Sequence, residues 1–166
     1  MPEITCIGHV GLYCDDVDKQ RDFYTQVLGF KVTDLARGGN GYFMSAQPRA
    51  EHHQLLLLGG GKGDGKQLQQ LSFHTGSLAE VRAYYQRLKA AGARINRTVT
   101  HGNAVSVYFY DPEDNLLEIY WDTGILCHQP FGYPVDLDGS DDAVMAQVRE
   151  YVAAHGRPWS PDEIEG

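Results

Sequence analysis

The sequence predicts an α+β fold that consists of two strand–helix–strand–strand–strand (βαβββ) modules and one further helix near the C-terminus. Three observations predict this fold. A strand-like segment and a helical segment occur together twice at a constant offset of 61 residues, and three more strand-like segments follow each pair. A glycine-rich tract at residues 59–66 separates the two copies, and a capped amphipathic segment begins at Ser140. The 166 residues are enough for a single domain with one hydrophobic core.

The first module, residues 1–60, begins with an expected strand over residues 4–14, "ITCIGHVGLYC". Asp15 and Asp16 then supply the carboxylates that favour a helix start, and apolar residues recur at helical spacing until Gly29 ends the helix. Short strands are expected near residues 30–35, 41–46 and 52–58.

The second module, residues 67–123, repeats this pattern after the glycine-rich connector. Aligning His9 with Gln70 also aligns Asp16 with Ser77, so Ser77 is the expected cap of the second helix. The same offset aligns Leu12 with Phe73, Tyr13 with His74, Val17 with Leu78 and Val27 with Leu88. The last two strands should form a hairpin around the turn "DPEDN".

The C-terminal extension, residues 124–166, is expected to be loop-like as far as Gly139. A helix follows, with Ser140 at its start and Gly156 at its end. Its expected apolar face consists of Val144, Val148, Tyr151 and Val152. The final stretch, "WSPDEIEG", has the composition of a solvated tail.

The composition argues against several classes of partner. A net charge of −8 would repel a phosphate backbone, so neither nucleic acid nor an anionic membrane is an expected partner. No apolar run is long enough to cross a membrane, and the N-terminus lacks a signal-peptide pattern. Cys6, Cys14 and Cys127 contain no C-x-x-C pair, so we expect reduced thiols in a cytoplasmic protein.

Two polar residues interrupt apolar strands: His9 in "CIGHVGLYC" and Glu118 in "NLLEIYW". A buried carboxylate needs a cation, a hydrogen-bond network or a metal. Taken alone, Glu118 could instead lie on the solvent face of an edge strand, and His9 could be an ordinary core histidine. The repeat gives each an equivalent, Gln70 for His9 and Leu57 for Glu118. If the modules face each other across a pseudo-twofold, these four residues occupy the central positions of one cavity.

The segments "GHVGLYCDDVDKQRDFYTQVLGF" and "DPEDNLLEIYW" resemble the vicinal oxygen chelate superfamily. This superfamily includes glyoxalase I, bleomycin-resistance proteins, methylmalonyl-CoA epimerase and type I extradiol dioxygenases. The resemblance covers about residues 5–125, and the tail "CHQPFGYPVDLDGSDD" also resembles single-domain extradiol ring-cleavage dioxygenases. It implies that the two modules form an incomplete mixed β-barrel around a metal site. In that site His9 matches the first metal histidine and Glu118 the last metal glutamate.

Leu57 favours the extradiol branch of the superfamily. Glyoxalase-like members fill all four central positions with ligands, whereas extradiol enzymes use two histidines and one carboxylate and leave positions open for substrate and dioxygen. This chain departs from the extradiol pattern at Gln70, where that branch has histidine. An amide oxygen is a weaker donor, but glutamine binds metal in some branches. The resemblance therefore implies His9, Gln70 and Glu118 as the metal ligands.

Three further residues match the extradiol pattern. Tyr108, ten residues before the metal glutamate, matches a tyrosine that hydrogen-bonds the substrate. His101 matches the histidine before that strand, although its distance from Tyr108 is two residues shorter. His53 in "HHQLLLL", rather than His52, matches a catalytic acid/base near the dioxygen position. The ordinary alternatives are a strand aromatic for Tyr108 and surface histidines for the other two. His74 is expected to line the pocket wall.

The resemblance thus implies a metal-dependent extradiol dioxygenase that cleaves a catechol-type aromatic with O2 and uses Fe(II) or Mn(II). Two alternatives stay open. One is a non-redox metal-dependent isomerase or lyase on the same scaffold, and the other is a small-molecule binding or resistance protein with a degenerate metal site. The resemblance also implies a homodimer or higher homo-oligomer, because members of the superfamily often pair through sheet edges.

Overall fold

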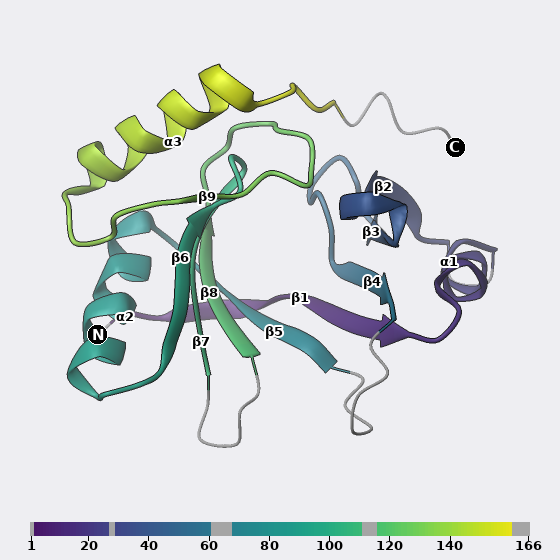
Figure 1. Ribbon diagram of the computed structural model, residues 1–166, viewed down its shortest axis with the longest axis horizontal. Coiled ribbons are helices and arrows are strands. Elements are labelled where there is room, and N and C mark those ends of the chain that lie inside the picture. Colours follow the sequence, from purple (N-terminus) through teal and green to yellow (C-terminus); the bar gives the residue numbers. More distant parts are fainter. Residues whose placement is uncertain (1, 27–28, 61–67, 111–115, 161–166) are drawn as a thin grey trace. The chain divides into compact units, whose positions relative to one another are not determined.

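Strand β1 (Ile4–Cys14) is the first element of the computed structural model, which describes residues 2–26, 29–60, 68–110 and 116–160 (Figure 1). The elements that follow it in the first module are α1 (Val17–Gln26), β2 (Lys31–Leu35), β3 (Gly41–Ser45) and β4 (Leu55–Gly59). The second module consists of β5 (Leu68–Thr75), α2 (Leu78–Ala90), β6 (Ile95–Thr100), β7 (Ala104–Tyr110) and β8 (Leu116–Asp122). A 3₁₀ turn (Arg37–Gly39), a short strand β9 (Tyr133–Pro134) and helix α3 (Asp141–His155) complete the described chain. The βαβββ series therefore occurs twice, as predicted.

Two compact units contain these elements. Unit 1 comprises Met1–Gly8 and Ser72–Pro158, and unit 2 comprises His9–Leu71 and Trp159–Gly166. Strands β1 and β5 each have residues in both units, because the divisions fall within these strands.

In unit 2 the strands are neighbours in the order β2-β3-β4-β1. Strand β1 is parallel to β4, whereas β3 is antiparallel to both of its neighbours. Helix α1 begins as predicted, because the backbone N–H of Lys19 donates to the Asp16 carboxylate at 3.0 Å. The core of the unit is formed by Cys14, Met44, Leu55 and Leu57.

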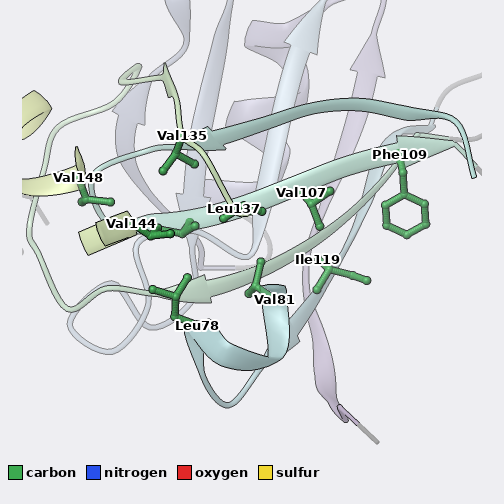
Figure 2. Packing of buried hydrophobic residues seen from close by; sticks show 10 residues of the cluster. Leu78, Val81, Val107, Phe109, Ile119, Val135, Leu137, Val144 and Val148 are labelled. Atoms are coloured by element: carbon green, nitrogen blue, oxygen red, sulfur yellow. The ribbon is translucent and has the colours of Figure 1, made fainter. Parts of the chain in front are cut away.

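In unit 1 the order is β5-β8-β7-β6-β9, and the pairs β8–β7, β7–β6 and β6–β9 are antiparallel. Helices α2 and α3 supply apolar side chains to one face of this sheet, where residues of β7 and β8 point into the same cluster (Figure 2). The cluster consists of Leu78, Val81, Val105, Val107, Phe109, Ile119, Val135, Leu137, Val144 and Val148. Burying one such side chain contributes about 1.5–3 kcal/mol. The side chains on the other face of β7 and β8 are not part of this apolar cluster.

Both helices of unit 1 have the predicted caps. Ser77 accepts a hydrogen bond from the backbone N–H of Glu80, and Ser140 accepts one from Ala143. The predicted apolar residues of α3 include Val144 and Val148, which are fully buried. The fold class is α+β with an open mixed sheet, in agreement with the prediction.

Three details differ from the sequence-based expectations. Strand β4 begins at Leu55 rather than near residue 52, because the ladder with β3 begins at the pair Met44–Leu55. The stretch expected to be a loop contains β9, which pairs with β6. Trp159, expected in a solvated tail, is only 6% exposed.

Some predicted features lie outside the described residues. These are most of the glycine-rich connector and the turn at residues 111–115. Among the described helices, none combines the length and apolar character needed to cross a membrane.

Candidate active site

His9 and Gln70, which the repeat places in equivalent positions, are in direct contact in unit 2. Alternation along β1 turns the His9 side chain inward, and the residue is 7% exposed. Gln70 on β5 is 5% exposed, and its amide nitrogen lies 2.9 Å from His9 Nε2. Because the nitrogen and oxygen of a glutamine amide exchange places by a rotation, the same contact can present the amide oxygen.

His53 lies beside this pair, in the segment that precedes β4. Its ring centroid is 4.3 Å from that of His9, and the two planes are tilted by 50°. The Phe43 ring contacts His53 at a centroid distance of 4.9 Å. Leu57, the fourth central position, is fully buried in the apolar core of unit 2. Three of the residues selected from the sequence, His9, Gln70 and His53, are therefore brought together.

Glu118 is buried in unit 1, where it is 2% exposed. It does not lie on an edge strand, because β8 has β5 on one side and β7 on the other. The simple alternative of a solvent-facing carboxylate is therefore wrong. The hydroxyl of Ser72, on β5, donates to a Glu118 carboxylate oxygen at 2.6 Å. This short bond orients the Glu118 side chain.

Tyr108 is the direct cross-strand partner of Glu118 on β7, so both side chains lie on the same face of the sheet. Tyr108 is 4% exposed, so it is a buried aromatic residue of β7. Its hydroxyl lies 3.1 Å from Nε2 of His101, and His101 Nδ1 lies 2.7 Å from the carbonyl oxygen of Phe131. Because a carbonyl only accepts, Nδ1 must donate to Phe131. A neutral His101 therefore accepts from the Tyr108 hydroxyl.

His74, expected in a pocket wall, is engaged in unit 1 by two other residues. Its Nδ1 lies 2.9 Å from the Thr5 hydroxyl, and its Nε2 lies 3.1 Å from an Asp122 carboxylate oxygen. These contacts tie the start of β1 to the end of β8. They give His74 a structural role, and its proposed position in a pocket wall stays a prediction.

Sequence reasoning did not assign roles to two of the contacting residues. Ser72 has a detectable signal, since it lies two residues after Gln70 and therefore on the same face of β5. Tyr120 crosses the backbone of Gly8, where an added Cβ would meet the tyrosine ring and hydroxyl. That contact joins residues far apart in the chain and leaves no local signal.

The donor chemistry of these residues suits a divalent metal. Two ligand atoms that bind one metal at about 2.1 Å and at a right angle lie about 3 Å apart. The side-chain contact between His9 and Gln70, at 2.9 Å, has this spacing. Within the described ranges, no group of three or more His, Cys, Asp and Glu residues is arranged to hold a metal ion. A metal site with three protein ligands among the described residues would therefore need a donor of another type, and the Gln70 amide is such a donor in contact with His9.

Comparison with known protein families gives one match that covers most of the chain. The family model described as the Glyoxalase/Bleomycin resistance protein/Dioxygenase superfamily matches residues 6–119.

Two curated relatives are named as dioxygenases. A manganese-dependent 2,3-dihydroxybiphenyl 1,2-dioxygenase from Geobacillus genomosp. 3 is 27% identical over 123 residues, which are 72% of this chain and 38% of that protein. A catechol-2,3-dioxygenase from Bacillus subtilis (strain 168) is 31% identical over 103 residues, which are 59% of this chain and 36% of that protein. The chain thus covers less than half the length of either relative.

Two solved structures are similar in fold and in sequence. A homoprotocatechuate 2,3-dioxygenase from Arthrobacter globiformis has a TM-score of 0.62 and 28% identity, with 74% of this chain and 37% of that chain covered. A Mn(II)-bound glyoxalase from Novosphingobium aromaticivorans has a TM-score of 0.62 and 25% identity, with 74% and 40% covered.

Proposed function

Because the chain belongs to the glyoxalase/bleomycin resistance protein/dioxygenase superfamily, we propose that it is a metal-dependent extradiol dioxygenase that cleaves a catechol-type aromatic with O2. The names of the curated relatives support this proposal. The observation that carries it is the grouping of side chains within each unit. A proposed ligand, His9, lies against a proposed acid/base group, His53, and another proposed ligand, Glu118, lies opposite Tyr108.

In this proposal His9, Gln70 and Glu118 hold the metal, which is Fe(II) or Mn(II). Two contacts that involve these proposed ligands come from alternate residues of one strand. On β5, Gln70 contacts His9, and Ser72 donates to Glu118. The metal, when bound, would supply the activation of O2 and the binding of both catechol oxygens.

The chain's own residues would bind and orient the aromatic and manage its protons. The Tyr108 hydroxyl would hydrogen-bond a catechol oxygen, and His101 would hold that hydroxyl in place through their 3.1 Å contact. His53 would hold or move a proton at its ring nitrogen, near the position where O2 binds. The apolar Leu57 would add no fourth ligand.

The direct test measures oxygen uptake. The protein is first loaded with Fe(II), or separately with Mn(II), under anaerobic conditions. Addition of air with a panel of catechols should consume O2 and produce the yellow absorbance of a ring-opened product. Glu118→Gln should remove this activity and lower metal content, because the neutral amide removes the charge of the only proposed carboxylate ligand. The matched control is Glu150→Gln, an exposed position on α3, which should keep both.

The proposal is wrong if the metal-loaded protein consumes no oxygen with any catechol. It is also wrong if Glu118→Gln and Glu150→Gln behave alike in metal content and activity.

A second candidate function has support in the amide at position 70 and in the similarity to a Mn(II)-bound glyoxalase. It is a non-redox isomerase or lyase that acts on a chelating pair of oxygens. Activity with Zn(II), Ni(II) or Co(II) in the absence of O2 would favour this candidate. A small-molecule binding protein would instead keep its ligand affinity in Glu118→Ala.

A further inference from the structure

A second histidine, His52, lies behind the proposed acid/base residue His53 in unit 2. The Nδ1 atoms of the two rings are 3.0 Å apart, and the ring planes are perpendicular. On its far side, His52 Nε2 lies 3.6 Å from a carboxylate oxygen of Asp34. The side chains of His52 and Asp34 are only 10% and 9% exposed. Asp34, His52 and His53 therefore form a series in which each member faces the next.

The surroundings hold His52 in this orientation. Its ring contacts the Trp159 indole at a centroid distance of 5.0 Å and the Phe43 ring at 5.7 Å. The Trp159 indole N–H donates to the backbone carbonyl of Thr33 at 3.1 Å. The His52 ring is thus packed between aromatic side chains, with one edge toward a carboxylate and the other toward a second imidazole.

Asp34 faces His52 because the β2–β3 ladder is irregular at this point. Val32 pairs with Met44, but Asp34 pairs with Phe43, so Thr33 is the extra residue of a β-bulge. A bulge changes the face to which the following side chains point. Here it places a carboxylate beside the histidines and leaves the Thr33 carbonyl to accept from Trp159.

The charge of the carboxylate favours one arrangement of the protons on the two rings. At 3.6 Å this contact is too long for a hydrogen bond, and His52 Nε2 has no hydrogen-bond partner among the described residues. The negative charge of Asp34 nevertheless attracts a proton, so a neutral His52 is favoured with its proton on Nε2. Nδ1 of His52 is then an acceptor, and the 3.0 Å contact requires His53 Nδ1 to donate. His53 then carries its proton on Nδ1 and has an accepting Nε2. This is the tautomer that a general base needs for taking a proton at Nε2.

We propose that His52, with the charge of Asp34 near its Nε2, is a positioning residue that fixes the ring orientation and the tautomer of His53. This inference rests on the proposed function for its consequence in catalysis. Its structural content, the tautomer of His53, does not depend on which reaction the protein performs.

The first test is NMR of the full chain labelled with ¹⁵N-histidine and freed of paramagnetic metal. Long-range ¹⁵N–¹H spectra distinguish the two neutral tautomers, because protonated and unprotonated ring nitrogens have well-separated shifts. In the wild-type protein, His53 should carry its proton on Nδ1. His52→Phe keeps an aromatic ring but removes the acceptor, and it should shift His53 toward the other tautomer. Asp34→Asn, which removes the charge from the series, should shift it in the same direction.

The second test is steady-state oxygen uptake with a catechol. His52→Phe should lower kcat by about 10- to 100-fold, as is typical when a residue that orients a functional group is lost, with KM changed by less than about twofold. His52→Asn places an amide oxygen near the position of the lost Nδ1 and should recover part of kcat. The control is His155→Phe, an exposed histidine stacked on Tyr133, which should leave kcat and the His53 tautomer unchanged.

The inference is overturned if wild-type His53 carries its proton on Nε2. It is also overturned if His52→Phe and Asp34→Asn keep the wild-type tautomer, or if His52→Phe keeps the wild-type kcat. If His52→Phe fails to fold, Asp34→Asn and the wild-type spectrum still decide the outcome. Absence of oxygen uptake by the wild-type protein would instead contradict the proposed function, and the NMR result would stand independently.

Discussion

Two buried serines of unit 1 differ in whether the side-chain hydroxyl has a hydrogen-bond partner. Ser72 and Ser106 are both fully buried. Ser72 donates to the Glu118 carboxylate at 2.6 Å, whereas the Ser106 hydroxyl has no hydrogen-bond partner among the described residues. The first hydroxyl holds the Glu118 side chain in place, and the second carries an uncompensated desolvation cost.

Ser72→Ala should therefore lower metal affinity, by about 10- to 100-fold, because it removes the bond that orients a proposed ligand. Ser106→Ala should keep the metal affinity and leave the free energy of unfolding unchanged or higher by about 1 kcal/mol. Calorimetric titration with Mn(II) and urea denaturation measure the two quantities. Equal metal affinities for the two variants would contradict a role for Ser72 in orienting Glu118.

At the level of single residues, the sequence identifies buried polar residues within strands more readily than the residues that contact them. His9 and Glu118 are conspicuous because each is polar within an apolar strand, and both are buried in the structure. Ser72 and His52 are less conspicuous, because their roles depend on strand pairing and on a bulge. A bulge of one residue cannot be recognised from alternation alone. The metal itself and the ligand roles of His9, Gln70 and Glu118 stay predictions.

At the level of elements, β1 is fixed by a close approach at Gly8. A Cβ at this position would overlap the Tyr120 side chain, which crosses the backbone there. Gly8 immediately precedes His9 in the chain and is the last residue of this strand in unit 1. The sequence shows a glycine at this position, but only the structure shows that the space is taken by an aromatic ring.

Gly8→Ala should lower the free energy of unfolding by about 1–3 kcal/mol, because either the Tyr120 ring or the strand must move. The matched control is Gly132→Ala, since a Cβ at that position meets its nearest neighbours only at ordinary contact distances, from 3.7 Å. Thermal and urea denaturation of both variants check the difference. If Gly8→Ala were as stable as Gly132→Ala, the close approach of Tyr120 would be wrong.

The element boundaries were predicted well where local chemistry sets them. Ser77 and Ser140 cap the two helices of unit 1 because a hydroxyl there accepts an orphan backbone N–H. Strand β4 was predicted to begin three residues too early. Its true start depends on the register with β3, and the histidine side chains that precede it make ring contacts instead.

At the level of the whole molecule, the chain returns to unit 2 at Trp159 after α3. Composition suggested a solvated tail, but the indole is buried and hydrogen-bonded to Thr33, 126 residues earlier. Such a contact lies beyond local sequence reasoning. Trp159→Ala should cost about 3–5 kcal/mol of unfolding free energy, and Trp159→Phe only about 1 kcal/mol for the lost hydrogen bond. Urea denaturation measures both, and a fully stable Trp159→Ala would contradict a contribution of the buried indole to stability.

The position of Trp159 also has an optical consequence. The sequence contains two tryptophans, and they fall one in each unit: Trp121 on β8 in unit 1 and Trp159 in unit 2. Trp121→Phe therefore keeps only Trp159, whose fluorescence reports on unit 2. Trp159→Phe keeps only Trp121, whose fluorescence reports on unit 1. Because β1 and β5 have residues in both units, we expect the two emission changes to coincide during urea denaturation after correction for the stability of each variant. Separated transitions would show that each unit unfolds independently, and the fluorescence would identify which one unfolds first.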